Sequence, residues 1–191
     1  QAVSHALIEK AAEAAEGSVT FLFQGGEPTL AGLEFYRDLT AYVRQTFPPG
    51  LAVQYAVQTN GMRLDEEWCR LFQEERFLVG LSLDGDRERH DRFRRDGAGK
   101  GTYDRVVRAA RLLERAGVDY NVLTVVTGHL ARHVQSVFSA LCRGGFRFQQ
   151  YIPCLDPLEE ERGGQDWSLS PEAYEGFLKT LFDLWYRELE Q

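Results

Sequence analysis

The residues best suited to chemistry form the segment Gln24-Gly25-Gly26-Glu27-Pro28, which follows a run of β-branched and aromatic residues. Two adjacent glycines allow the backbone to approach a ligand closely, with φ values that other residues avoid. Backbone carbonyls together with a carboxylate suit a small cation, such as the ammonium group of an amino acid. A phosphate would need N–H donors and lysine instead. The segment therefore predicts either an ammonium site or an ordinary strand-to-helix turn.

Polar residues also follow the other apolar runs of the chain. Ligands of parallel α/β folds lie at the carboxyl ends of strands, so these positions are the next candidates. They are Asn60, Ser82, Asp84, His129 and Cys154. Asn60 is either a ligand-facing amide or a turn residue. Asp84 is expected first as a turn residue, with contact to a substrate or to a bound nucleotide as the alternative.

The sequence offers no recognisable set of metal ligands. Its three cysteines are Cys69, Cys142 and Cys154; their odd number argues against a disulfide framework, and their spacing of 73 and 12 residues excludes a CxxC-type zinc or redox site. His129 and His133 are four residues apart, but no neighbouring carboxylate completes a metal site. We therefore expect no metal-binding residue in this chain.

Hydrophobic patterns predict the elements that must position the candidate residues. Helical spacing of apolar residues predicts helices, and short β-branched or aromatic runs predict strands. The predicted helices cover 2–15, 30–46, 65–75, 102–116, 131–142 and 170–189. The predicted strands cover 18–23, 52–58, 77–83, 119–126 and 146–152, with polar loops at 84–101 and 153–169. This alternation implies one α/β domain with a parallel sheet, either doubly wound or an incomplete barrel.

Composition narrows the class of protein. The chain has 191 residues, of which 43% are hydrophobic, so it is long enough for one domain with a core. A net charge of −7 disfavours nucleic-acid binding, which needs a basic face. The apolar runs are too short to span a membrane. The first residues carry no secretory signal, and we expect a reducing, cytoplasmic location.

Six segments resemble, in the same order, the anaerobic sulfatase-maturating enzymes. These belong to the radical S-adenosylmethionine (SAM) superfamily, in the branch with a C-terminal auxiliary-cluster (SPASM) domain. The segments are FLFQGGEPTL (21–30), QTNG (58–61), GLSLDG (80–85), HDRFRRDGAGKGTYDRV (90–106), YNVLTVV (120–126) and QYIPCLD (150–156). The stretch 168–186 resembles the same group. The resemblance implies a partial (β/α)6 barrel, of which this chain supplies strands two to six.

The resemblance also implies an activity. The enzyme would bind SAM and a [4Fe-4S] cluster and would take electrons from a donor such as flavodoxin or ferredoxin. Reductive cleavage of SAM would give a 5′-deoxyadenosyl radical, which removes a Cβ hydrogen from a Cys or Ser of a sulfatase polypeptide. The product would be formylglycine. Nothing in the sequence distinguishes a Cys target from a Ser target.

Individual roles follow from the same resemblance. Glu27 and the backbone of Gly25 and Gly26 would bind the methionine ammonium, and Gln24 would contact SAM. Ser82 would bond the ribose or the carboxylate of SAM. Arg94 would pair with the carboxylate, a task that suits the guanidinium fork. Leu155 would pack on the adenine. No catalytic residue is assigned.

The chain departs from the family pattern in one respect. The family binds its cluster through a CxxxCxxC motif, and this sequence has none. We therefore expect residues 1–191 to be a radical SAM core that is incomplete at its N-terminus, lacks the SPASM domain and is inactive alone. Another SPASM-type maturase that forms thioether or other crosslinks, or a non-catalytic SAM- or peptide-binding module, remains an alternative. The stretch IPCLDPLEE (152–160) favours sulfatase maturation.

Overall fold

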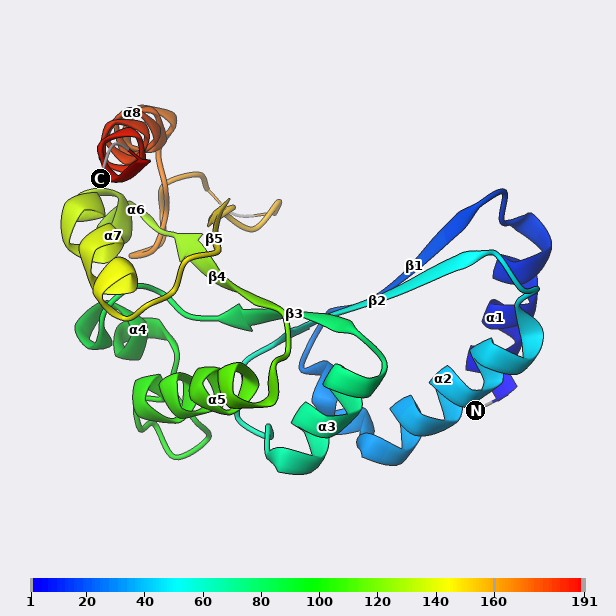
Figure 1. The fold of residues 1–191 in the computed structure, drawn as a ribbon. Coiled ribbons are helices and arrows are strands. Elements are labelled where there is room, and N and C mark those ends of the chain that lie inside the picture. The colour runs from blue at the N-terminus through cyan, green and yellow to red at the C-terminus, as the bar shows by residue number, and fades with distance from the viewer. Residues whose placement is uncertain (1, 160, 190–191) are drawn as a thin grey trace. The chain divides into compact units, whose positions relative to one another are not determined.

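The computed structural model, which describes residues 2–159 and 161–189, consists of alternating strands and helices (Figure 1). The strands are β1 (Ser18–Phe23), β2 (Ala52–Thr59), β3 (Phe77–Ser82), β4 (Tyr120–Val126) and β5 (Gln149–Pro153). They form one sheet whose strand order follows the sequence, and β1–β2, β2–β3 and β4–β5 pair in parallel. The predicted α/β class with a parallel sheet is confirmed.

Helices alternate with these strands. They are α1 (Ala2–Ala14), the 3-10 helix η1 (Pro28–Ala31), α2 (Leu33–Thr46), α3 (Glu66–Glu74), α4 (Arg87–Phe93), α5 (Tyr103–Ala116), α6 (Gly128–Ala131), α7 (Val134–Arg143) and α8 (Pro171–Leu189). Asp65 caps α3 by accepting hydrogen bonds from the backbone N–H groups of Glu67 and Trp68, each at 3.0 Å. Pro171 is the first residue of α8, where its missing N–H costs nothing.

Two predicted helices are each divided into two. The helix predicted over 30–46 is split into η1 and α2, because Gly32 between them has a φ of 85°, outside the right-handed helical region. The helix predicted over 131–142 is split into α6 and α7. His133, which precedes α7, has a φ of −128° and a ψ of 26° and so interrupts the helical path.

Two other predictions from hydrophobic spacing are wrong. The segment 84–101, predicted as a loop, contains α4, which is too polar to show an apolar period. Asp86 starts α4 by accepting a hydrogen bond from the N–H of Arg89 at 3.1 Å. The strand predicted over 146–152 begins only at Gln149. The N–H of Phe146 is needed to close α7, since it donates to the carbonyl of Leu141 at 3.0 Å.

The chain divides into two compact units. The first comprises the described residues up to Leu81 together with Val107–Tyr120, and the second comprises Ser82–Val106 and the described residues from Asn121 onward. In the first unit, the aromatic rings of Tyr36, Trp68, Phe72 and Phe77 pack together, with ring centroids 5.1 to 6.1 Å apart in three of the pairs. The core of the second unit includes Leu83, Val122, Val126, Val137, Leu141 and Phe177.

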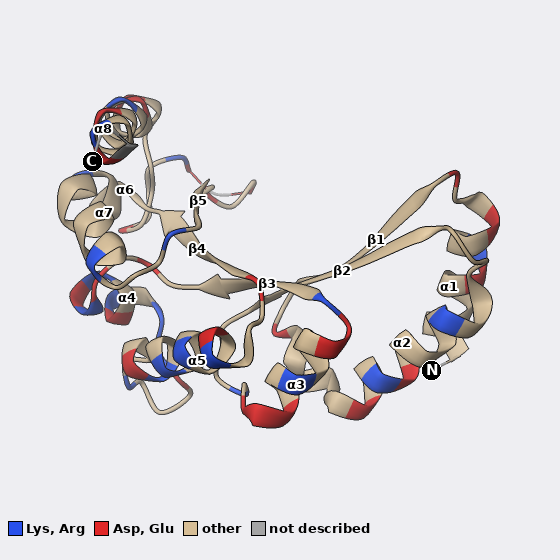
Figure 2. Ribbon diagram, in the orientation of Figure 1, with Lys and Arg blue, Asp and Glu red and all other residues tan. Residues whose placement is uncertain are grey.

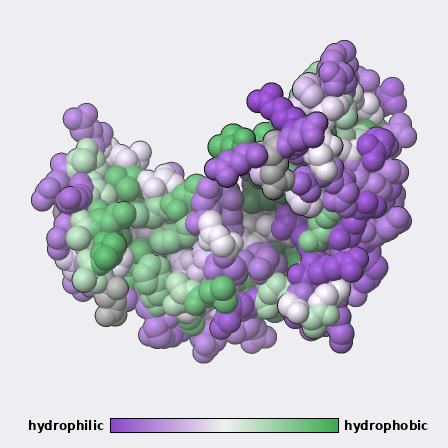
Figure 3. Space-filling view, turned by 180° about the vertical axis from the view of Figure 1, so that it is seen from behind, coloured by the Kyte–Doolittle hydropathy of each residue, from purple (hydrophilic) through white to green (hydrophobic). Residues whose placement is uncertain are grey.

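Charged side chains are confined to the helices and loops of both units. Figure 2 shows Lys, Arg, Asp and Glu along the helices, while the strands carry none of them. Apolar side chains nevertheless reach the surface in several places (Figure 3). In the first unit the exposed ones include Val3, Leu7 and Leu22, the last of which lies on the edge strand β1.

Candidate functional site

The glycine pair of the segment Gln24–Glu27 forms a tight, exposed turn directly after β1. Gly25 has a φ of 93° and Gly26 a φ of 51°, both in the region that favours glycine. A Cβ atom at either position would meet nothing within 4 Å, so the backbone conformation and not crowding requires glycine there. Gln24 is exposed beside them. The turn therefore presents its backbone openly.

The Glu27 carboxylate is held in place by four hydrogen bonds from the protein. Its Oε1 accepts from the N–H of Thr29 at 3.0 Å, from the Thr29 hydroxyl at 2.6 Å and from the Thr59 hydroxyl at 2.7 Å. Its Oε2 accepts from the N–H of Asn60 at 2.8 Å. An ionised carboxylate offers about four acceptor positions, roughly two on each oxygen. The remaining acceptor capacity of Glu27 is thus on Oε2.

A buried tyrosine holds the other side of this turn. The Tyr36 hydroxyl donates to the carbonyl of Pro28 at 3.1 Å, and the residue is 1% exposed. Burial, with a smaller contribution from the Glu27 charge, raises the pKa of Tyr36 to about 12. The hydroxyl therefore remains a neutral donor, and the turn is anchored from α2 as well as from β2.

Asn60 acts as a turn residue at the end of β2. Its N–H is taken by Glu27, and its side-chain Oδ1 accepts from the N–H of Met62 at 2.9 Å. Gly61 follows with a φ of 71°, and a Cβ there would lie 2.6 Å from Cδ1 of Leu81. The structure confirms Asn60 as a turn residue, and a ligand contact of its amide stays a prediction. Thr59 was not singled out from the sequence, since a threonine at a strand end carries no distinctive signal.

In the second unit, Ser82 ends β3 half-buried, and Asp84 forms an ion pair with Arg94. Arg94 Nε donates to Asp84 Oδ2 at 2.5 Å, and Nη2 donates to Oδ1 at 3.3 Å. Asp84 Oδ1 also accepts from the N–H of Val125 in β4 at 2.8 Å. Asp84 is only 7% exposed and is therefore more than the loop-turn residue that the sequence predicted. Two of the five N–H donors of Arg94 are used in this pair, which leaves others for a ligand.

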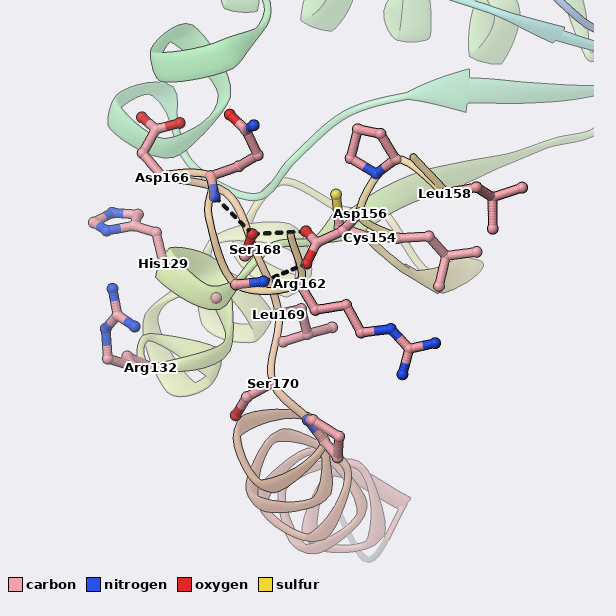
Figure 4. A pocket seen from close by; sticks show the side chains of 16 residues that line it. His129, Arg132, Cys154, Asp156, Leu158, Arg162, Asp166, Ser168, Leu169 and Ser170 are labelled. Atoms are coloured by element: carbon pink, nitrogen blue, oxygen red, sulfur yellow. Dashed lines mark hydrogen bonds between the residues drawn. The ribbon is translucent and has the colours of Figure 1, made fainter. Parts of the chain in front are cut away.

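A cavity of about 1130 Å³ lies beside the loop that follows β5 (Figure 4). Leu155 lines it and is 82% exposed, and Cys154 lies next to it in sequence. Asp156 holds the loop by accepting from the N–H of Gly163 at 2.8 Å and from the Ser168 hydroxyl at 2.6 Å. These hydrogen bonds lower the pKa of Asp156.

The predicted site residues are distributed over both units. Gln24, Gly25, Gly26 and Glu27 belong to the first unit, and Ser82, Arg94 and Leu155 belong to the second. Within the first unit the structure brings Glu27 together with Thr59 and Asn60, and within the second it brings Arg94 together with Asp84.

The described residues form no cluster of three or more His, Cys, Asp or Glu side chains that could hold a metal ion. Cys69 is buried in α3, and burial raises the pKa of its thiol to about 11, which disfavours the thiolate that metals bind. Burial also raises the pKa of Cys142 and of Cys154. None of the helices within the described residues has the length and apolar character needed to cross a membrane.

Comparisons with known proteins agree with this geometry. The family model of the radical SAM superfamily matches residues 3–141. A cysteine-type anaerobic sulfatase-maturating enzyme of Clostridium novyi (strain NT) is 42% identical over 182 residues, which are 95% of this chain and 49% of the relative. A serine-type enzyme of Klebsiella aerogenes is 34% identical over 173 residues, which are 91% of this chain and 42% of the relative. The chain thus spans about half the length of the curated relatives it matches.

A solved structure agrees equally well. The structure of anSMEcpe with bound AdoMet and Kp18Cys peptide superposes with a TM-score of 0.96 at 43% identity, covering 99% of this chain and 52% of that one. This agreement, with the family match, confirms the partial barrel and the resemblance that the sequence predicted.

Proposed function

Since the chain belongs to the radical SAM superfamily, we propose that it is the SAM-binding core of an anaerobic sulfatase-maturating enzyme. The observation that carries this proposal is the 42% identity to a cysteine-type enzyme, which extends over 95% of the chain. We propose further that the core extends over residues 1–191, beyond the part that the family model matches.

The methionine ammonium of SAM is bound at the turn after β1. Three features support this assignment. The positive φ values of Gly25 and Gly26 leave their backbone open to a ligand, and Oε2 of Glu27 accepts only one hydrogen bond from the described residues. The turn is also anchored before any ligand binds, so binding costs little ordering. Gln24, exposed next to the turn, contacts SAM.

The carboxylate of SAM is bound by Arg94, and its ribose or carboxylate by Ser82. Arg94 suits this role because Asp84 holds its guanidinium in place and occupies only two of its N–H donors, so that others can bind a carboxylate. Leu155, an exposed apolar side chain at the cavity after β5, packs on the adenine.

The same proposal gives the whole protein a [4Fe-4S] cluster, but the described residues of this chain do not fit one. Such a cluster needs three closely spaced thiolates, and Cys69 and Cys142 lie in different units and carry raised pKa values. In the whole protein, SAM bound to a reduced cluster would supply the 5′-deoxyadenosyl radical. The role of this chain in the reaction is to bind and orient SAM.

The proposed reaction of the whole protein is the oxidation of a sulfatase cysteine to formylglycine in the cytoplasm, with a donor such as flavodoxin or ferredoxin supplying the electron for the reductive cleavage of SAM. The cysteine-type target is favoured over serine because identity is 42 to 44% with cysteine-type enzymes and 30 to 34% with serine-type enzymes.

The test uses the full-length protein under anaerobic conditions with two sulfatase peptides that differ only in Cys or Ser at the target position. We expect mass spectrometry to find formylglycine from the Cys peptide and much less from the Ser peptide. Calorimetry on the same protein should detect SAM binding. A crosslinked peptide product would support the thioether-forming alternative, and SAM binding without any product would support the non-catalytic module.

A further inference from the structure

One fully buried titratable side chain has no role in the function proposed above. His90 lies in α4, has 0% exposure and is surrounded by the segment that carries Asp84 and Arg94. Its ring packs against Tyr103, with the centroids 5.7 Å apart, and hydrogen-bonds on both sides: Nδ1 lies 3.2 Å from the backbone nitrogen of Asp84, and Nε2 lies 3.0 Å from Oγ1 of Thr102. A buried histidine whose two ring nitrogens both have hydrogen-bond partners fixes the positions of those partners in the local structure.

The partners determine where the ring proton lies. The backbone N–H of Asp84 can only donate, so Nδ1 of His90 is the acceptor and the proton of the neutral ring is on Nε2. This proton is donated to Thr102 Oγ1, whose own hydroxyl proton is donated to the carbonyl of Arg94 at 3.0 Å. Burial lowers the pKa of His90 to about 4; the negative charges of Asp84 and Asp91 oppose this shift, and the Arg94 charge adds to it. The ring is therefore neutral and in one tautomer at neutral pH.

The ring thus connects the backbones of both members of the ion pair. It holds the N–H of Asp84 on one side and the carbonyl of Arg94, through Thr102, on the other. The N–H of Arg94 also donates to the carbonyl of His90 at 2.9 Å. The side chains of Asp84 and Arg94 then meet at 2.5 Å. Moving the ring would displace both partners of the pair.

The return of the chain to α5 supports the same arrangement. Asp91 Oδ1 accepts from the N–H of Tyr103 at 2.9 Å, next to Thr102. A Cβ atom on Gly101 would lie 2.2 Å from the carboxyl carbon of Asp91, so a larger residue there would displace this carboxylate. Thr102 is therefore held independently at the position where it can relay the hydrogen bond.

We propose that His90 is a positioning residue for Arg94, which it fixes through Asp84 and Thr102 so that the guanidinium can receive the carboxylate of SAM. This inference rests on the role proposed for Arg94. It makes a specific claim: the loss of His90 weakens binding of the carboxylate of SAM and leaves the binding of the rest of the molecule unchanged.

The test measures binding to the full-length protein by calorimetry with two ligands, SAM and decarboxylated SAM, which lacks only the carboxylate. His90→Phe keeps the apolar bulk of the ring and removes both hydrogen bonds. We expect this variant to bind SAM about tenfold more weakly, as the loss of a charged contact implies, and to bind decarboxylated SAM within about twofold of the unaltered protein. In an Arg94→Ala background, His90→Phe should have no further effect on SAM.

Two conservative variants and one control complete the experiment. His90→Asn can still accept from Asp84, and His90→Gln can still donate to Thr102, so each should recover part of the SAM affinity. They also replace His90→Phe in the comparison if that variant does not fold. His133→Phe removes a half-buried histidine whose ring contacts His129, through its carbonyl at 2.9 Å and through its ring, and it should leave SAM affinity unchanged.

An equal loss of affinity for SAM and for decarboxylated SAM would mean that His90 serves only the general stability of the fold. This result would overturn the inference. Unchanged SAM affinity in all His90 variants would overturn it as well. Failure of the unaltered protein to bind SAM would instead overturn the proposed function, and the inference with it.

Discussion

The Thr59 hydroxyl donates a hydrogen bond to Glu27 Oε1 at 2.7 Å and so joins the ends of β1 and β2 across 32 residues of sequence. Thr59 is 2% exposed, which shields the contact from water. The turn after β1, which carries Glu27, is thus held in one conformation by the neighbouring strand β2.

Replacing Thr59 by valine should destabilise the folded chain. The substitution keeps the shape of the side chain, removes one donor from a carboxylate and removes the acceptor of the Gly61 N–H, which bonds the hydroxyl at 3.1 Å. We therefore expect the free energy of unfolding to fall by about 2 kcal/mol. Urea denaturation measures the change. Thr20→Val is the control, because its hydroxyl makes an exposed contact with Gln54, and it should change stability by less than about 0.5 kcal/mol. Equal effects of the two substitutions would contradict a special role for Thr59.

Glu27→Gln should weaken the binding of SAM by the full-length protein. The substitution removes the negative charge that we propose faces the ammonium group, and we expect a loss of about tenfold or more in affinity, measured by calorimetry. Glu34→Gln removes an exposed carboxylate of α2 that pairs with Arg37, and it should leave the affinity unchanged. An unaltered affinity in Glu27→Gln would remove the turn from the SAM site.

The buried His90 predicts a loss of stability in acid. Its pKa is lowered from 6.5 to about 4 in the folded chain, so between these pH values the unfolded chain binds more protons. Stability therefore rises with pH across this window and falls as the pH drops from 6.5 toward 4. From pH 7 to pH 4.5 this contribution amounts to about 2–3 kcal/mol.

Urea denaturation of the unaltered chain and of His90→Gln at pH 7 and at pH 4.5 checks this prediction. The variant should lose less stability on acidification, by about the amount given above, because it has no imidazole to protonate. Parallel losses in the two proteins would show that other groups cause the acid sensitivity.

We expect the chain to aggregate through strand β1. It lies at the edge of the sheet formed by the described residues, and Leu22 on it is 52% exposed. An exposed apolar edge strand can pair with other chains, and a lysine on it opposes such pairing. We expect Leu22→Lys to reduce light scattering of the concentrated chain. Val3→Lys, a change at an exposed position of α1, should have a smaller effect, and the opposite order would refute the role of the edge.

The 191-residue chain should remain colourless after anaerobic incubation with iron and sulfide. Its cysteines are separated and carry raised pKa values, so they cannot supply three adjacent thiolates. Iron analysis and visible absorption provide the measurement. Four iron atoms per chain would contradict the expectation.

The elements with strong hydrophobic patterns could be predicted from the sequence. β1 and β2 differ from their predicted ranges by at most one residue, and Asp65 caps α3 as its residue type indicates. α4 could not be found in this way, because its charged residues show no apolar period and its one buried side chain is a histidine. Gly32, which separates η1 from α2, acts through its positive φ, and an apolar pattern does not report φ.

By itself, the sequence determined the α/β class, the order of the elements and the turn Gln24–Glu27 as the place to search for a ligand, because hydrophobic period and glycine spacing are local properties. Only the tertiary structure decided that Thr59 and Asn60 hold Glu27, and that Asp84 contacts both Arg94 and the His90 ring. These partners lie between 6 and 33 residues apart and meet through strand pairing or burial. Such contacts depend on the path of the whole chain, which no local pattern records.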